Sequence, residues 1–118
     1  MKALTVDDQY EIIQIGELKI DSRRREVFIR GNKVDLTKKE FDVLKYLAMQ
    51  PGNVVSREDL LKKVWGYGDY IGEIRTIDVT VARLRDKIEK RKGSPEFLIT
   101  KRGVGYYLKD QDKDKTIL

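Results

Sequence analysis

The chain has 118 residues and a formal net charge of +5, a length that allows one domain with a single modest core. It has neither cysteine nor histidine, which excludes disulfides, thiolate metal sites and an imidazole base, and we expect no metal or cofactor. No apolar run approaches the roughly 18 residues of a membrane span, and the first residues lack a signal-peptide core, so we expect a cytoplasmic protein.

Short runs of alternating apolar and polar residues predict a small antiparallel sheet at the start of the chain. The strands are expected at residues 12–15, 18–20, 26–30 and 33–36, with a Gly-Asn turn at 31–32. The sheet carries no cluster of reactive side chains, and we interpret it as support for the rest of the domain.

Thr37 begins the first predicted helix. Glu40 lies three residues further on and completes a capping box, while Leu36 can pack on Phe41 as a hydrophobic staple. Apolar residues then recur at helical spacing, and the helix is expected to end at the turn signal of residues 50–53.

The same start signal recurs at Ser56, which predicts a second helix that ends at Gly66. A glycine-rich loop at residues 66–73 leads into a third helix at residues 75–91, which the Gly-Ser-Pro sequence breaks. Two β-rich runs, residues 97–101 and 106–108, then predict a hairpin.

The predicted fold is α+β: a winged helix-turn-helix with an N-terminal four-stranded antiparallel sheet, three helices and a C-terminal β-hairpin wing. We expect a linker remnant at residues 1–10, the domain at 11–109 and a flexible tail at 110–118, where charges alternate without apolar residues.

The positive charge is concentrated late in the chain. Residues 1–74 hold 13 basic and 13 acidic side chains, whereas residues 75–92 hold seven basic and three acidic ones. Such a concentration indicates a surface that binds a polyanion. The alternative is a solvated helix face with internal ion pairs, since Asp78, Asp86 and Glu89 have basic neighbours at helical spacing.

Helical phasing divides the third helix into a core face and a candidate nucleic-acid face. Ile77, Val81, Leu84 and Ile88 form the apolar stripe. The opposite face is predicted to carry Thr76, Val79, Thr80, Arg83 and Lys87.

These side chains suit the major groove of double-stranded DNA. Arg83 can bind a guanine edge through two hydrogen bonds, and Val79 can contact a thymine methyl group. The remaining polar residues are predicted to contact the DNA backbone, namely Thr76, Thr80 and Lys87 on the same face and Arg75 and Arg85 beside it.

The hairpin adds a second basic element. Lys101 and Arg102 occupy its tight turn, where one of them can enter a minor groove. Of Tyr106 and Tyr107, one is expected to pack inward and the other to offer its hydroxyl to a phosphate. The Gly-Val-Gly sequence at 103–105 also permits a phosphate-loop interpretation, which is weak without a third glycine and a following helix.

These motifs resemble the C-terminal effector domain of OmpR/PhoB-type response regulators of two-component systems. The matching stretches are LTKKEFDVLKYLAMQPGNVVSREDLLKKVWG, RTIDVTVARLRDKIE and ITKRGVGYYL, and with the leading sheet they span about residues 12–108. The resemblance implies transcriptional regulation through promoter direct repeats, bound by head-to-tail pairs of domains.

It also implies roles for individual residues. Positions matching Val79 and Arg83 contact bases, and the one matching Arg102 enters the minor groove. Phosphate contacts are implied for Trp65, Arg75, Thr76, Thr80, Arg85, Thr100 and Tyr106, with Lys101 beside them. The loop with Tyr67, Asp69 and Tyr70 is similar to one that touches RNA polymerase, although a simple connector is an equal alternative.

Two departures from the family pattern matter. Ala82 stands where many members have a basic residue, so we expect one phosphate contact to be missing. The receiver domain through which a sensor kinase acts is not in this sequence, and we expect the sequence to be a fragment rather than a regulator without a receiver.

Two other classes of function remain as alternatives. A winged helix can serve as a protein-interaction module, with residues 66–73 as its main contact. An enzyme would need an activated nucleophile or a metal site, and the carboxylates here are dispersed at helix starts and turns. We therefore expect a DNA-binding protein that is not an enzyme.

Overall fold

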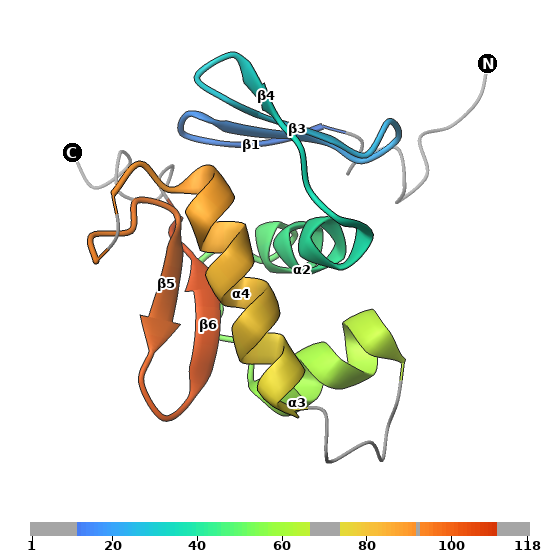
Figure 1. Ribbon diagram of the computed structural model, residues 1–118, viewed down its shortest axis with the longest axis vertical. Coiled ribbons are helices and arrows are strands. Elements are labelled where there is room, and N and C mark those ends of the chain that lie inside the picture. The colour runs from blue at the N-terminus through green and yellow to red at the C-terminus, as the bar shows by residue number, and fades with distance from the viewer. Residues whose placement is uncertain (1–11, 67–73, 92, 111–118) are drawn as a thin grey trace.

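The computed structural model describes residues 12–66, 74–91 and 93–110. Four strands form one sheet in chain order, and a separate two-stranded hairpin closes the domain (Figure 1). The elements are β1 (Ile12–Ile15), β2 (Leu18–Asp21), β3 (Glu26–Ile29), β4 (Asn32–Val34), α2 (Lys38–Ala48), α3 (Arg57–Leu60), the π-helical turn η1 (Leu61–Trp65), α4 (Ile74–Ile88), β5 (Leu98–Lys101) and β6 (Gly105–Leu108). The predicted fold class and element order are confirmed.

The sheet is antiparallel throughout, and its register brings apolar side chains together on one face. Ile20 pairs with both Ile13 and Val27, and Val27 pairs in turn with Val34. Because side chains alternate between the faces of a strand, the polar residues between them face away from the core. This apolar face covers α2, which lies directly beneath the sheet (Figure 1).

Both predicted helix starts are confirmed. At α2 the Thr37 hydroxyl accepts a hydrogen bond from the Glu40 amide at 3.2 Å, and the Glu40 carboxylate accepts one from the Thr37 amide at 2.9 Å. At α3 the Ser56 hydroxyl accepts from the Asp59 amide at 3.0 Å. These bonds satisfy amides that have no partner within their helices.

The second helix ends at Gly66, as predicted, but its last turn is π-helical. The Gly66 amide donates to the carbonyl oxygens of Leu61 and Lys62, both at 3.0 Å. Gly66 has φ +83°, a left-handed conformation that suits glycine at the end of a helix.

The third helix is shorter than predicted: it ends at Ile88 rather than at residue 91. Beyond Ile88, the side chain of Glu89 binds the segment that leads into the hairpin. Its carboxylate accepts hydrogen bonds from the amides of Glu96, Phe97 and Leu98 at 2.6, 3.0 and 2.7 Å. The Glu89 amide still donates to the Arg85 carbonyl at 2.8 Å, so the chain turns back after Glu89 and reaches the hairpin at Leu98. Six strand boundaries also differ from the prediction, each by one or two residues; the largest difference is at the end of β4, which lies at Val34 rather than at residue 36.

The hairpin is attached to the helices through the backbone of Val55. The Val55 amide donates to the Tyr106 carbonyl at 2.8 Å, and the Tyr106 amide donates to the Val55 carbonyl at 2.9 Å. Gly105 permits this approach, because a Cβ atom there would lie 1.9 Å from the Val55 carbonyl oxygen. Together with the buried Phe97, Leu98 and Leu108, this bridge joins the hairpin to the core.

No helix within the described ranges is both long enough and apolar enough to cross a membrane. The predicted linker at residues 1–10 lies outside the described residues, as does the predicted tail apart from Asp110.

Candidate nucleic-acid interface

The outer face of α4 forms the centre of the candidate interface. Arg75, Val79, Ala82 and Arg83 are exposed there, and Val79 is 41% exposed although it is apolar. Within the described ranges, neither Arg75 nor Arg83 has a hydrogen bond or an ion pair to another side chain. Two guanidinium groups and a small apolar side chain are thus presented together on one face.

The predicted exposure of Thr80 is wrong, since this residue is only 9% exposed. Thr80 follows Ile77 by three residues, which places the two side chains only about 60° apart around the helix axis. It therefore lies at the edge of the core face, while Thr76 is half-buried and Ala82 takes a place on the outer face. A phosphate contact of Thr80 stays a prediction.

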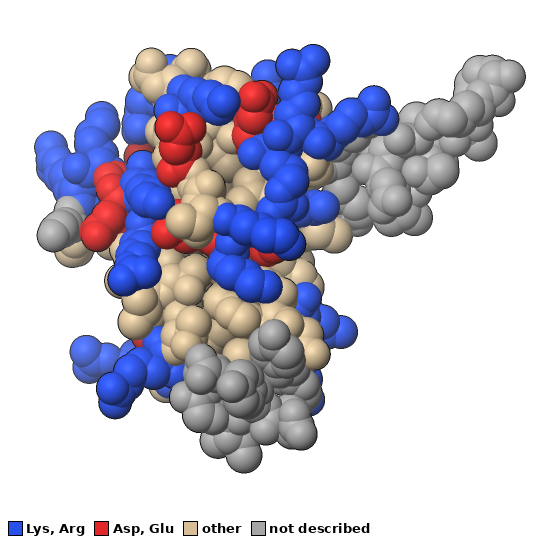
Figure 2. Space-filling view, turned by 45° about the vertical axis from the view of Figure 1, so that its right-hand side comes forward, with Lys and Arg blue, Asp and Glu red and all other residues tan. Residues whose placement is uncertain are grey.

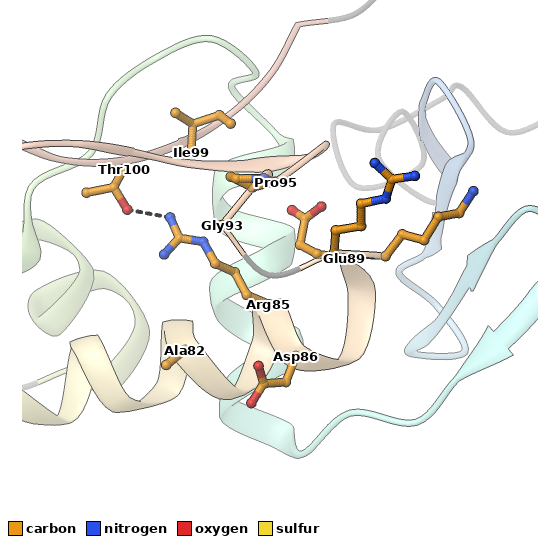
Figure 3. Close-up of a pocket in the computed structure, with 10 residues that line it drawn as sticks. Ala82, Arg85, Asp86, Glu89, Gly93, Pro95, Ile99 and Thr100 are labelled. Carbon is orange, nitrogen blue, oxygen red and sulfur yellow. Dashed lines mark hydrogen bonds between the residues drawn. The ribbon is translucent and has the colours of Figure 1, made fainter.

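Arg85 faces the hairpin. Its Nε donates to the Leu98 carbonyl at 3.0 Å, and an Nη atom donates to the Thr100 hydroxyl. The guanidinium also lies 5.6 Å from the centre of the Tyr106 ring. Figure 3 shows Arg85 and Thr100 pointing toward each other across an open groove between α4 and the hairpin. The structure thus brings together three of the predicted phosphate-contact residues.

Lys87 points away from this groove, toward α2. Its Nζ lies 2.7 Å from the Oε1 atom of Glu40, a side chain that is only 3% exposed. Burial is the strongest single influence on the Glu40 carboxyl and raises its pKa, but the hydrogen bonds from Lys87 and Thr37 together outweigh it. The pKa of Glu40 therefore lies below its ordinary value, and the carboxylate is charged at neutral pH.

The turn of the hairpin presents Lys101 and Arg102 to solvent. The Val104 amide donates to the Lys101 carbonyl at 2.9 Å, and Gly103 has φ +79°, which explains the glycine in this tight turn. Val104 is 53% exposed beside the two cations. Neither Lys101 nor Arg102 pairs with an acidic residue in the part of the chain that the structure describes.

Tyr106 is the inward-facing member of the tyrosine pair: it is buried, whereas Tyr107 is half-buried. Its hydroxyl donates to Oδ1 of Asp78 at 2.5 Å, and the same oxygen accepts from Nε of Arg57 at 2.8 Å. Burial raises the pKa of Tyr106, and the neighbouring Asp78 raises it further. The phenol therefore stays protonated at neutral pH.

Asp78 and Arg57 were not among the predicted site residues. From helical spacing, Asp78 is predicted only to form ion pairs with basic residues of its own helix. Its partners in the structure lie on α3 and β6. Because these partners are far from it in sequence, no local spacing pattern could have indicated the contact.

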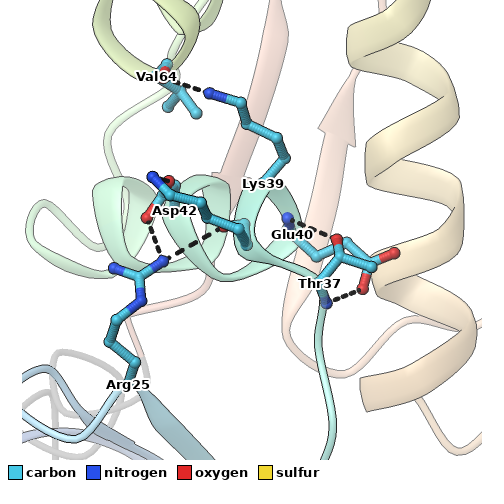
Figure 4. A network of polar contacts seen from close by, with 7 residues as sticks. Arg25, Thr37, Lys39, Glu40, Asp42 and Val64 are labelled. Atoms are coloured by element: carbon cyan, nitrogen blue, oxygen red, sulfur yellow. Dashed lines mark hydrogen bonds and ion pairs between the residues drawn. The ribbon is translucent and has the colours of Figure 1, made fainter.

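Trp65 lies at the end of η1 beside the first turn of α2. The Lys39 ammonium is 5.2 Å from the centre of the indole ring and donates to the Val64 carbonyl at 3.2 Å. Figure 4 shows the hydrogen bond between Lys39 and Val64, together with the 2.8 Å ion pair that joins Asp42 of α2 to Arg25, which lies between β2 and β3. Trp65 is half-buried, so the side chain of Lys39 helps to fix the indole in place.

Basic side chains are not confined to α4 and the hairpin. Figure 2 shows Lys and Arg side chains gathered at the level of the sheet, with acidic side chains between them. The predicted polymerase-contact residues Tyr67, Asp69 and Tyr70 lie outside the described residues. Within the described ranges, no group of acidic side chains is arranged to hold a metal ion.

The four-stranded sheet, three helices and hairpin, with an exposed basic face on α4, define a winged helix-turn-helix domain of the DNA-binding class. A family model described as "Transcriptional regulatory protein, C terminal" matches residues 31–108, and the chain belongs to this family. The family consists of transcription regulators that bind DNA and are not enzymes.

Solved structures support the assignment to the OmpR/PhoB type. The response regulator DrrB of Thermotoga maritima, described as an OmpR/PhoB homologue, is 36% identical with a TM-score of 0.75; the match covers 84% of this chain and 44% of DrrB. The DNA-binding domain of CpxR from E. coli is 32% identical with a TM-score of 0.73, covering 85% of this chain and 97% of that domain.

The DNA-binding domain of RstA from Klebsiella pneumoniae, solved in complex with the RstA box, is 35% identical with a TM-score of 0.77. The match covers 85% of this chain and 98% of that domain. The chain thus corresponds to less than half of DrrB but to nearly all of the two isolated DNA-binding domains. The predicted resemblance to OmpR/PhoB-type effector domains is confirmed.

Proposed function

We propose that this domain binds promoter DNA in a sequence-specific way, with α4 in the major groove and the hairpin wing at the minor groove. The observation that carries the proposal is the shared exposure of Arg75, Val79 and Arg83 on one helix and of Lys101 and Arg102 at the wing turn. These cations lie on α4 and at the turn of the hairpin, two elements that border the groove lined by Ala82, Arg85, Ile99 and Thr100. The cations thus form two basic elements, and a winged helix needs two such elements to contact adjacent grooves of the DNA duplex.

Within α4, the roles follow from side-chain chemistry. Arg83 has no partner among the described residues, so its guanidinium is available for a guanine edge, and Val79 is available for a thymine methyl group. Arg75 is proposed as a backbone contact, with Thr76 and Thr80 at the edge of the same helix. Lys87 can join them only if its ammonium leaves Glu40.

In the wing, Arg102 is proposed to enter the minor groove, where the negative potential attracts a guanidinium. Lys101 is proposed to contact the neighbouring phosphates of the DNA backbone. Arg85, Thr100 and Tyr106 are already clustered across the groove, and we place a phosphate against this cluster. Trp65 contributes a further backbone contact from the end of η1.

The wider setting is proposed from the family. We infer that two such domains bind direct repeats head to tail, and that residues 66–73 touch RNA polymerase. In the natural protein, an upstream receiver domain phosphorylated by a sensor kinase would control the pairing, as expected for a response regulator such as DrrB. A regulator of this kind acts on the chromosome, which places it in the cytoplasm.

The first test is selection of binding sites from random duplex DNA, followed by affinity measurement over a range of salt concentrations. A selected site should contain two half-sites in the same orientation, and the affinity should fall steeply with salt because neutralised phosphates release counterions. A flat dependence on salt, or failure to enrich any sequence, would argue against the proposal.

Arg83→Ala tests the assignment of base contacts. It should weaken binding to the selected site by about 1–3 kcal/mol and leave binding to random DNA almost unchanged. Arg75→Ala is the matched control on the same helix face, and it should weaken binding to both kinds of DNA by a similar factor. Equal effects of the two substitutions on both DNAs would show that Arg83 does not contact a base.

A further inference from the structure

We infer that Asp78 is a positioning residue for DNA recognition: its carboxylate holds α4, the start of α3 and wing strand β6 in one fixed arrangement. This arrangement lets Arg102 on the wing reach the minor groove at the same time as Arg83 on α4 reaches the major groove. The inference rests on the proposed function, because it concerns how the proposed contacts are aligned rather than which residues make them.

The first observation is that a single carboxylate oxygen joins three elements. Oδ1 of Asp78 accepts the Tyr106 hydroxyl at 2.5 Å and Nε of Arg57 at 2.8 Å. Arg57 is the first residue of α3 and Tyr106 lies in β6, so both donors come from outside α4. Short hydrogen bonds to an ionised oxygen are among the stronger polar contacts in proteins.

The second observation is that the Tyr106 end of this contact is rigid. Tyr106 as a whole residue is 6% exposed, and its ring lies against the Arg85 guanidinium. Its backbone forms both hydrogen bonds of the bridge to Val55. An ion pair between two exposed side chains contributes little. Here, however, the carboxylate is bound to a side chain that is itself held by the core.

The third observation is the short path from Tyr106 to the wing turn. In the hairpin Tyr106 pairs with Thr100, and the next pair is Gly105 with Lys101, after which the chain turns at Arg102. An anchor so close to the turn limits the motion of the Arg102 side chain relative to α4. A preorganised contact costs less ordering entropy when DNA binds.

The test is a double-mutant cycle between Asp78 and Arg102. Affinities of the wild type, Asp78→Ala, Arg102→Ala and the double variant are measured at one salt concentration, on a duplex that the wild type selects from random DNA. Arg102→Ala should weaken binding on the order of tenfold in the wild type but less than about threefold in the Asp78→Ala background. Loss of the anchor thus removes much of what Arg102 contributes.

A second variant covers the case in which Asp78→Ala does not fold. Tyr106→Phe keeps the packed ring and removes only the hydroxyl that binds Asp78, and it should reduce the contribution of Arg102 in the same way. Asp86→Ala is the matched control, because it removes the same charge from α4 without breaking a contact among the described residues. In that background the effect of Arg102→Ala should stay on the order of tenfold.

The outcomes separate the inference from the proposed function. If Arg102→Ala has the same effect in the wild type, Asp78→Ala and Tyr106→Phe backgrounds, the positioning role is wrong while DNA binding by the wing stands. If Arg102→Ala has no effect in the wild type, the wing does not reach the minor groove and both are overturned. A merely structural role of Asp78 would lower the melting temperature without coupling to Arg102.

Discussion

Replacing Gly105 by alanine should detach the wing from the helices. A Cβ atom at this position would lie 1.9 Å from the carbonyl oxygen of Val55, 2.6 Å from its carbonyl carbon and 2.9 Å from Cα of Ser56. All three neighbours are backbone atoms, so a change of side-chain rotamer cannot relieve the overlap. The two chain segments must therefore move apart.

The separation breaks the bridge between Val55 and Tyr106, whose two hydrogen bonds are 2.8 and 2.9 Å long. Each such bond contributes about 1 kcal/mol, and displacement of the packed Tyr106 ring adds to the loss, giving a total of about 2–4 kcal/mol. For a domain of this size, each kcal/mol lowers the melting temperature by about 4–8 °C. Gly105→Ala should therefore melt about 10–30 °C below the wild type.

Thermal and urea unfolding followed by circular dichroism measure the difference. Gly103→Ala is the matched control in the same hairpin: Gly103 has φ +79° but no atom within 4 Å of an added Cβ, so only backbone strain of about 1 kcal/mol is expected. If Gly105→Ala were as stable as Gly103→Ala, the bridge to Val55 would not hold the wing.

Three further predictions concern single side chains and pH. Glu40→Gln removes the ion pair with Lys87 and should lower the free energy of unfolding by about 1–2 kcal/mol. Urea titrations at neutral pH measure this difference. Glu58→Gln changes an exposed glutamate and is the control that should have little effect. Because the pKa of Glu40 is lowered in the folded state, its stabilisation is complete above the ordinary glutamate range and is lost as pH falls through the lower folded pKa. The gap between wild type and Glu40→Gln should accordingly narrow in acid, and a gap that is constant with pH would contradict this assignment. Ala82→Arg adds a cation to the exposed face of α4 and should tighten binding to any DNA duplex. The slope of log affinity against log salt concentration should become steeper by about 0.9. An unchanged slope would show that position 82 does not face a phosphate.

Much of the fold could be predicted because its signals are local. The capping pairs at Thr37 and Ser56 both form as expected, since each depends on residues within one helical turn. The sheet and the hairpin follow from alternation and turn residues, whose effects also span only a few positions.

The candidate site was predicted less completely, because long-range contacts decide how its side chains are used. Arg83 and Arg102 are exposed as predicted. By contrast, the partners of Arg85 and Lys87 lie on β5 and α2, and no spacing in the sequence indicates them. The burial of Thr80, unlike these partners, can be predicted from the sequence, because helical spacing from Ile77 places Thr80 at the edge of the core.

The carboxylate of Glu89 has a practical consequence for protein engineering. By accepting the amides of three successive residues, it fixes the start of the hairpin independently of the path of the chain before Glu96. The exposed residues Gly93 and Ser94 lie on that path and away from the wing turn. We therefore expect a short spacer or a fluorophore site inserted between them to leave the alignment of α4 and the wing unchanged. This junction offers a place to couple a reporter to DNA binding.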